Sequence, residues 1–130
     1  MAATSLVAVV DDDESVRRAL ARLIRSAGLD ADIFPSGDEF LETLTDHRPD
    51  CVVLDLHMPK VDGFAVQSWL AKAGIQIPVI VLTGHDTPEA QARAMKGGAV
   101  AYFRKPVDGE ALLSAIARAV SGGKEETAGA

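Results

Sequence analysis

The sequence predicts an α/β fold in which five strand–helix units, (βα)5, form one doubly wound parallel sheet. Five short apolar runs recur along the 130 residues, and three of them show no alternation of apolar and polar side chains. Such runs are typical of strands buried on both faces of a parallel sheet. A segment with apolar residues at helical spacing follows each run, and the connections are too short for a second domain. Every crossover is therefore expected to be right-handed.

The apolar runs place the five strands. Uninterrupted runs predict strands at Leu6–Val10, Cys51–Leu54 and Val79–Leu82. The run Ala31–Phe34 alternates and includes an acid, so we expect it at an edge of the sheet. Ala99–Phe103 is the fifth predicted strand.

Two helices are predicted in the first half of the chain. Apolar residues recur at helical spacing from Val16 to Ala27, and Gly28 is a suitable stop. Ser36 and Glu39 have the spacing of a capping box, which predicts the start of the second helix.

Three more helices are predicted in the second half. An apolar stripe between Val66 and Ala73 ends at Gly74, and we expect Trp69, which lies on it, to pack in the core. A further stripe, Leu112–Val120, predicts the last helix, with Asp108 as a possible cap.

The fourth helix has a different composition. Thr87 and Pro88 fit an N-cap followed by proline in the first turn, and the Ala-rich segment after them ends at Gly97. Met95 is its main large apolar residue, so we expect Met95 to anchor a helix that moves more easily than its neighbours.

Composition limits the function classes. The chain has 19 acids against 13 Lys and Arg, and its net charge of −6 argues against binding to nucleic acid or to an anionic membrane. No signal peptide or membrane-spanning stretch is visible, so a cytoplasmic location is expected. The single Cys51 excludes an intramolecular disulfide and is expected to be buried. Residues 1–120 are assigned to one domain and 121–130 to a flexible tail or the start of a linker.

Polar residues follow four of the predicted strands, and they share one edge of the sheet because parallel strands end on the same side. They are Asp11, Asp12 and Asp13, then Asp55, then Thr83, and finally Arg104 and Lys105. If the first and third strands are neighbours, Asp11, Asp12 and Asp55 converge and repel one another unless a cation such as Mg²⁺ compensates. The alternative is that the acid triplet only caps the first helix.

These residue types fit the transfer of a phosphoryl group onto Asp55. The Asp55 carboxylate would attack, Mg²⁺ and Lys105 would neutralise charge on the transferred group, and the Thr83 hydroxyl would bond to one of its oxygens. The sequence has neither a GxxxxGK nor a GxGxxG motif, so a bound nucleotide is not supported.

The chain resembles the receiver domain of two-component response regulators over about residues 5–120. The matching pieces, in family order, are Val9–Asp13, Val53–Pro59 with Asp62–Gly63, Leu82–Gly84, Gly98–Ala99 and Tyr102–Pro106. The segment Val81–His85 with Gly97–Ala99 is most similar to the subgroup of nitrogen-fixation and aromatic-catabolism regulators. The resemblance implies the flavodoxin-like strand order 2-1-3-4-5.

The resemblance also implies a metal site and a phosphoacceptor. Asp55 would accept the phosphoryl group, with Lys105 beside it. Asp12 would bind Mg²⁺ more directly and Asp11 largely through water, and the backbone carbonyl of His57 would complete the protein ligands. Asp13 is an extra acid for which a role at the start of the helix is favoured.

The same resemblance implies a switch and partners. Thr83 would be the switch hydroxyl, Tyr102 the switch aromatic, and Pro106 would follow a cis peptide bond. A sensor histidine kinase would donate the phosphoryl group, and the face of the fourth helix, fifth strand and last helix would form a phosphorylation-dependent homodimer. The rings of His57 and His85 lack further His or Cys partners for zinc, so a part in tuning acyl phosphate hydrolysis is favoured.

Several readings of this pattern stay open. The main one is a signalling switch rather than an enzyme, with only self-catalysed phosphorylation and dephosphorylation at Asp55. A phosphatase of the haloacid dehalogenase type would need its Asp pair after the first strand and a cap domain, and no residues are left for a cap. A degenerate receiver that serves only as a binding module usually loses the acids or the lysine, which this sequence keeps. The domain either acts alone through protein contacts or is the receiver end of a longer transcription factor.

Overall fold

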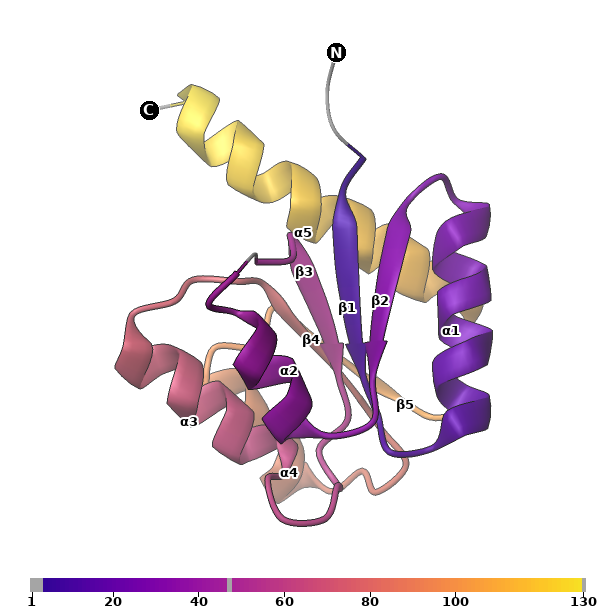
Figure 1. Cartoon of the computed structure of the whole chain (residues 1–130), viewed down its shortest axis with the longest axis vertical. Helices are drawn as coiled ribbons and strands as arrows, with labels where there is room; N and C mark the ends of the chain where they lie inside the picture. The colour runs from indigo at the N-terminus through magenta and orange to yellow at the C-terminus, as the bar shows by residue number, and fades with distance from the viewer. Residues whose placement is uncertain (1–3, 47, 130) are drawn as a thin grey trace.

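The predicted sheet is present in the structure, a computed structural model that describes residues 4–46 and 48–129 (Figure 1). All strand pairs are parallel, and their order β2-β1-β3-β4-β5 is the order that the resemblance implies. The strands are β1 (Leu6–Val10), β2 (Asp30–Phe34), β3 (Cys51–Leu54), β4 (Val79–Thr83) and β5 (Ala101–Arg104). The helices are α1 (Glu14–Ser26), α2 (Gly37–Thr43), α3 (Gly63–Ala73), α4 (Pro88–Lys96) and α5 (Gly109–Gly129).

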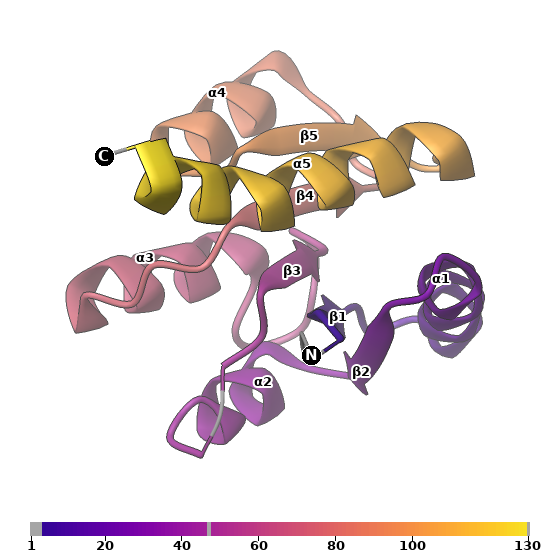
Figure 2. The same cartoon turned by 90° about the horizontal axis from the view of Figure 1, so that it is seen from above.

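Helices cover both faces of the sheet, so the molecule has three layers (Figures 1 and 2). On one face α2, α3 and α4 bury Phe40, Val66 and Ala94 against the strands. On the other face α1 and α5 bury Ile24 and Ile116. The uninterrupted apolar runs are explained by this arrangement, because successive side chains of β1, β3 and β4 enter opposite cores. Cys51 is fully buried, as predicted.

The predicted helix ends are largely confirmed. Asp13 caps α1, and its carboxylate accepts hydrogen bonds from the backbone N–H groups of Ser15 and Val16. Ser36 and Thr87 cap α2 and α4 through their hydroxyl oxygens. Gly74 ends α3 with a φ of 70°, a left-handed conformation that glycine adopts without strain.

Two expected core residues are exposed instead. Trp69 is 42% exposed, because Val66 and Leu70 already point at the sheet and Trp69 is rotated about 100° from Leu70 around α3. On α4 the residue that packs inward is Ala94, which is fully buried, while its neighbour Met95 is 43% exposed. The expectations for Trp69 and Met95 are therefore wrong, since each lies one position from the residue that faces the sheet.

The last helix is longer than the apolar stripe predicts. It continues through the residues predicted as a tail and ends at Gly129. Their assignment to a linker stays a prediction. Among the described residues, no helix is both long and apolar enough to cross a membrane.

Candidate functional site

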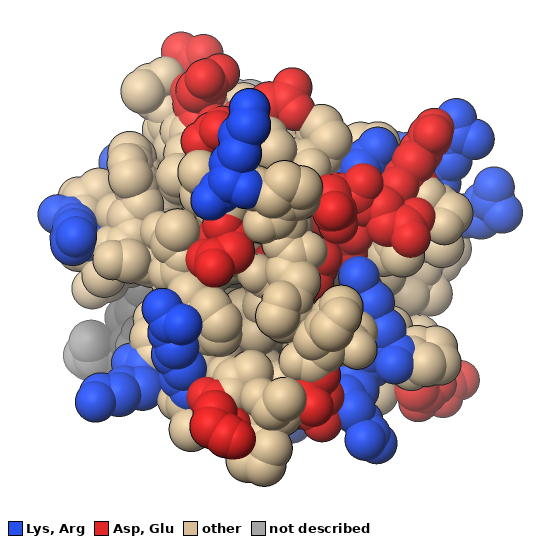
Figure 3. Space-filling view, turned by 90° about the horizontal axis from the view of Figure 1, so that it is seen from below, with Lys and Arg blue, Asp and Glu red and all other residues tan. Residues whose placement is uncertain are grey.

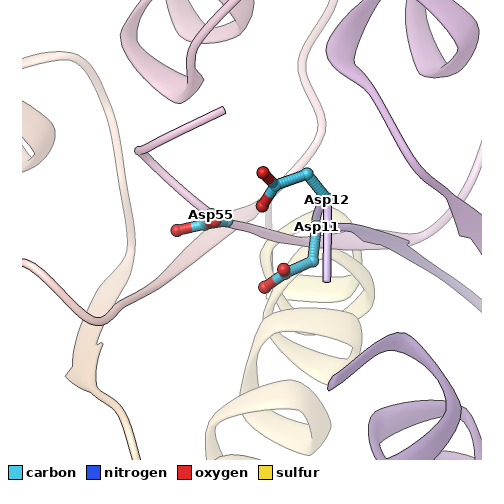
Figure 4. Close-up of side chains that lie close together, drawn as sticks. All are labelled: Asp11, Asp12 and Asp55. Carbon is cyan, nitrogen blue, oxygen red and sulfur yellow. The ribbon is translucent and has the colours of Figure 1, made fainter. Parts of the chain in front are cut away.

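The three acids predicted to converge do so at the carboxyl ends of β1 and β3. Val10 pairs with Leu54 across these strands, and the Asp55 N–H donates to the Val10 carbonyl at 3.0 Å. This pairing places Asp11, Asp12 and Asp55 side by side, with one carboxylate oxygen from each lying within 4.8 Å of the others (Figure 4). The structure therefore supports the convergence reading over a helix-capping role for the whole triplet, since only Asp13 caps α1.

Asp55 is a buried acid whose ionisation is opposed by its surroundings. Its side chain is only 5% exposed. Burial, and next the charge of Asp11, raise the pKa of Asp55 from 3.8 to about 6, although Lys105 acts in the opposite direction. The His57 N–H donates to Asp55 Oδ1 at 3.3 Å. The carboxylate is thus held in one orientation in a place where additional positive charge would stabilise it.

Lys105 supplies the positive charge from the end of β5. Its Nζ lies 2.7 Å from Asp11 Oδ2 and 3.8 Å from Asp55 Oδ2. Burial alone would lower the pKa of Lys105, but the hydrogen bond that its ammonium donates to Asp11 and the nearby carboxylates raise the pKa above its usual value. The backbone positions this side chain, because the Lys105 N–H donates to the Thr83 carbonyl at 2.8 Å. The Lys105–Pro106 bond is cis, as the resemblance implies.

Thr83 lies at the end of β4 on the same edge. Its side chain is fully buried, and its hydroxyl oxygen accepts a hydrogen bond from the His85 N–H at 3.1 Å. The rings of His57 and His85 pack against each other with centroids 4.4 Å apart. The two histidines that the sequence predicts near the site therefore contact each other. His57 is hydrogen-bonded to Asp55 and His85 to Thr83, in both cases through the histidine backbone N–H.

Tyr102 occupies β5 next to β4, opposite Val81 in the sheet register. It packs on the same core as Ala90 and Ala94 of α4. Its hydroxyl is enclosed and forms no hydrogen bond with the residues that the structure describes. Burial, and next the Asp86 carboxylate, raise the pKa of Tyr102 to about 12. Tyr102 thus lies between the strand that ends in Thr83 and helix α4.

Two residues that position the acids were not identified from the sequence as having this role. Arg17 of α1 donates from Nη1 to the Asp11 carbonyl at 2.8 Å, but an arginine on a helix gives no sign of such a contact in the sequence. Gly63 packs directly against the backbone of the segment that carries Asp55, because a Cβ there would lie 2.6 Å from the Asp55 carbonyl oxygen and 2.8 Å from Leu56 Cα. Only its place in the family motif could have drawn attention to Gly63.

The donor set fits a hard divalent cation. Both oxygens of Asp11 already accept hydrogen bonds, one from Lys105 and one from the Asp13 N–H at 2.9 Å. Asp12 is exposed, and Asp55 Oδ2 lies 3.8 Å from the lysine ammonium, beyond hydrogen-bond distance, so these two carboxylates have an oxygen that is less engaged than those of Asp11. Figure 3 shows the molecule from this edge, with acidic side chains gathered on it and basic side chains beside them. Oxygen ligands of this kind suit Mg²⁺.

Comparison with known proteins places this site in a family. The family model for the response regulator receiver domain matches residues 7–117. Nodulation protein W of Bradyrhizobium diazoefficiens is 42% identical over 115 residues, which cover 88% of this chain and 51% of that protein. Response regulator protein TodT of Pseudomonas putida is 40% identical over 116 residues, which cover 89% of this chain and 51% of that protein. The chain spans about half the length of these two relatives.

Two further similarities are informative. The DNA-binding transcriptional regulator NtrC of Klebsiella pneumoniae is 36% identical over 118 residues, covering 91% of this chain and 25% of that protein. The crystal structure of a response regulator receiver protein from Burkholderia phymatum superposes with a TM-score of 0.81 at 44% identity, covering 91% of this chain and 96% of that one.

Proposed function

The chain belongs to the response regulator receiver domain family, and we propose that it works as a phosphorylation switch in which Asp55 is the phosphoacceptor. The observation that carries this proposal is the arrangement around Asp55. A buried carboxylate lies at the carboxyl edge of the sheet with two further acids within 4.8 Å and a lysine ammonium at 3.8 Å. These positions support the proposal, because they would supply a nucleophile, a place for a metal ion and a cation for the transferred group.

The transfer step follows from these positions. An oxygen of Asp55 attacks the phosphorus of a phosphohistidine on a sensor kinase, forming a P–O bond as the P–N bond breaks, and the departing imidazole takes up a proton. Lys105 then exchanges part of its contact with Asp11 for the new phosphoryl oxygens, which lie in the direction of Asp55 Oδ2. The pairing of Lys105 with Asp11 keeps its ammonium in place until the phosphoryl group arrives.

We assign the metal ligands to the oxygens of the site that are least engaged in hydrogen bonds. Asp12 and Asp55 would hold Mg²⁺ through carboxylate oxygens, Asp11 would act through water because both its oxygens are hydrogen-bonded, and His57 would contribute its backbone carbonyl. When bound, Mg²⁺ neutralises the charge of the acids and of the phosphoryl oxygens. The His57 and His85 rings lie next to Asp55 and Thr83, where they would affect the access of water to the acyl phosphate.

The switch begins at Thr83. Its hydroxyl oxygen accepts a hydrogen bond from the His85 N–H, and its O–H can donate to one of the new phosphoryl oxygens. Movement of Thr83 toward them shifts the segment that leads to α4 and changes the space next to Tyr102. Phosphorylation then favours a conformation already accessible to the protein, through the additional contacts made there.

The output is proposed to be the control of transcription. One relative is by name a DNA-binding transcriptional regulator, and the chain spans about half or less of the relatives that it matches. A receiver that ends near α5 would pass its change to a following DNA-binding domain in such a protein, in the cytoplasm, and would itself bind no DNA. A stand-alone regulator that acts through protein contacts is the alternative.

Phosphorylation at Asp55 is tested by intact-mass measurement. Wild-type protein incubated with Mg²⁺ and a small phosphodonor, or with a phosphorylated histidine kinase, should gain one acid-stable, base-labile phosphoryl group. The Asp55→Asn variant keeps the shape of the side chain but lacks the anionic nucleophile, so it should gain none. Retention of the added mass in that variant would show that Asp55 is not the acceptor.

A further inference from the structure

We infer that the groove between α2 and α3 is a docking site for a cationic amphipathic helix of a partner protein. The groove, of about 510 Å³, is lined on the α2 side by Asp38, Leu41 and Glu42 and on the α3 side by Val61, Ala65 and Trp69. The two helices pack side by side on one face of the sheet (Figures 1 and 2). This inference stands independently of the proposed function, because none of these residues belongs to the phosphorylation site.

The groove is apolar along its α3 side and ends in an exposed aromatic ring. Ala65 and Trp69 are four positions apart on α3 and therefore share a face of that helix. Trp69 is 42% exposed although Val66 and Leu70 beside it are buried. A partly exposed tryptophan next to a hollow is the kind of residue that dominates binding energy at protein interfaces, because it offers a large rigid apolar surface at low entropic cost.

The α2 side of the groove is acidic. Asp38 and Glu42 are also four positions apart, so their like charges face the groove from successive turns. Helix α2 carries Glu39 as well and has no Lys or Arg. None of the described residues that line the groove is basic. Like charges at this spacing destabilise a helix, so a cationic group that binds near Asp38 and Glu42 should stabilise α2.

These features specify one kind of occupant. A groove between two helices accepts apolar side chains that recur at positions i, i+3, i+4 and i+7 of an amphipathic helix. Lys or Arg flanking that apolar face would lie opposite Asp38 and Glu42. A second copy of this chain fits less well, since pairing groove on groove would bring the acids of both α2 helices together.

The test uses Trp69 as its own reporter, because it is the only tryptophan in the chain. The probe is a synthetic helical peptide of Leu and Lys, about 18 residues long, with Leu confined to one face. Saturable binding should shift the Trp69 emission to shorter wavelength as the ring leaves water. A peptide with Glu in place of Lys, and a scrambled Leu–Lys peptide of the same composition, should produce no saturable shift.

Matched variants separate this groove from general attraction to an acidic protein. Asp38→Asn combined with Glu42→Gln should weaken binding ~5- to 10-fold, the effect of losing two exposed ion pairs. Glu89→Gln combined with Glu110→Gln removes the same charge from α4 and α5 and should leave binding nearly unchanged. Ala65→Arg, at an exposed position, should abolish the Trp69 shift.

The outcomes decide the inference. Equal weakening by both charge-neutralising pairs would overturn it, because the peptide would then be held by net charge alone. If sedimentation shows a dimer without peptide and the Trp69 emission of that dimer is shifted to shorter wavelength, a second copy of the chain is the occupant and the inference is overturned. Calorimetric titration of Trp69→Ala, whose fold is checked by circular dichroism, should show at least ~10-fold weaker binding, as expected for an interface residue worth more than about 1.4 kcal/mol.

Discussion

The folded protein disfavours the ionised form of Asp55. The side chain is buried beside Asp11, so burial and then like charge raise the pKa of its carboxyl to about 6. An acid whose pKa is higher in the folded than in the unfolded protein binds its proton more tightly when folded. The free energy of unfolding therefore falls as the pH rises from about 4 to about 6, and the loss is complete above that range.

Asp55→Asn should consequently stabilise the protein without Mg²⁺ at pH 7.5. The difference between 3.8 and about 6 corresponds to at most ~3 kcal/mol, which should raise Tm by several degrees. The gain should shrink toward zero at pH 4, where Asp55 is largely protonated in the folded protein. Thermal unfolding of both proteins across this pH range measures the effect.

Glu42→Gln is the control for this pH series, because it neutralises an exposed acid on α2 rather than the buried one. Its Tm should differ from that of the wild type by much less, and the difference should not grow above pH 6. A gain from Asp55→Asn that is equally large at pH 4 would contradict the buried-charge explanation.

Substitution of Asp12 tests the metal site without disturbing the core. The residue is exposed, so Asp12→Ala should have little effect on stability in the absence of metal. Mg²⁺ should stabilise the wild type by ~1.4 kcal/mol at ten times its Kd, because it binds only the folded protein. The variant should lose most of this gain in a Tm titration with MgCl₂. An equal gain in both proteins would place the ion elsewhere.

At the residue scale, the sequence predicts which side chains belong to the site better than it predicts which of them contact one another. Asp11, Asp12, Asp55 and Lys105 could be predicted to share one edge, because parallel strands end there, but their meeting depended on the strand order that the family resemblance implied. The preference of Lys105 for Asp11 depends on side-chain directions within a few ångströms, which periodicity does not encode. Trp69 shows the same limit: an apolar stripe is too broad to distinguish the residue that faces the sheet from the next one.

The element that holds Asp55 is the connection from β3 to the start of α3. The Gly63 N–H donates to the Leu56 carbonyl at 3.0 Å, and Asp62 caps α3 by accepting from the Ala65 N–H. The first residue of the helix therefore packs against the backbone of the segment that carries Asp55. A side chain at position 63 would have no space there.

Gly63→Ala should destabilise the protein by ~1–3 kcal/mol, the usual cost of forcing a methyl group into packed backbone. Because the displaced atoms are the Asp55 carbonyl and Leu56, phosphorylation by a small phosphodonor should also slow. Denaturant unfolding measures the first effect and intact-mass kinetics the second. Gly122→Ala in α5 is the matched control, since no atom lies within 4 Å of a Cβ there and the helix should tolerate it. Equal stability of the two variants would contradict the close approach at Gly63.

At this scale, local signals account for most of what was predicted. Caps at Asp13, Ser36 and Thr87 and the stop at Gly74 depend on residues within one turn, and all four are present. The end of α5 was not predicted, because Gly122 and Gly123 interrupt the apolar stripe that would have indicated it. The cores formed between elements require the strand order, which came from family resemblance rather than from the residues.

In the whole molecule, α4 packs through small apolar residues together with polar and cation–π contacts to α3. Ala94 packs against the core, and the buried Gln67 side chain of α3 donates from Nε2 to the Ala94 carbonyl at 2.9 Å. Tyr102 lies beneath this helix with its hydroxyl unpartnered among the described residues. Met95 and Val100 leave apolar surface exposed nearby. The face formed by α4, β5 and α5 thus combines a helix that has few large apolar side chains in the core with surface that a second copy could cover.

Phosphorylation should therefore produce a homodimer through this face, and Thr83 should be required for it. Thr83→Ala keeps Asp55, Lys105 and the acids, so it should still accept the phosphoryl group, but it lacks the hydroxyl that would donate to a phosphoryl oxygen. We expect it to stay monomeric in sedimentation velocity under conditions in which the phosphorylated wild type dimerises. Thr83→Ser, which retains the hydroxyl, should dimerise. Dimerisation of Thr83→Ala to the wild-type extent would break the proposed link from Thr83 to Tyr102, whereas the absence of dimers in every phosphorylated protein would move the output to a different partner surface.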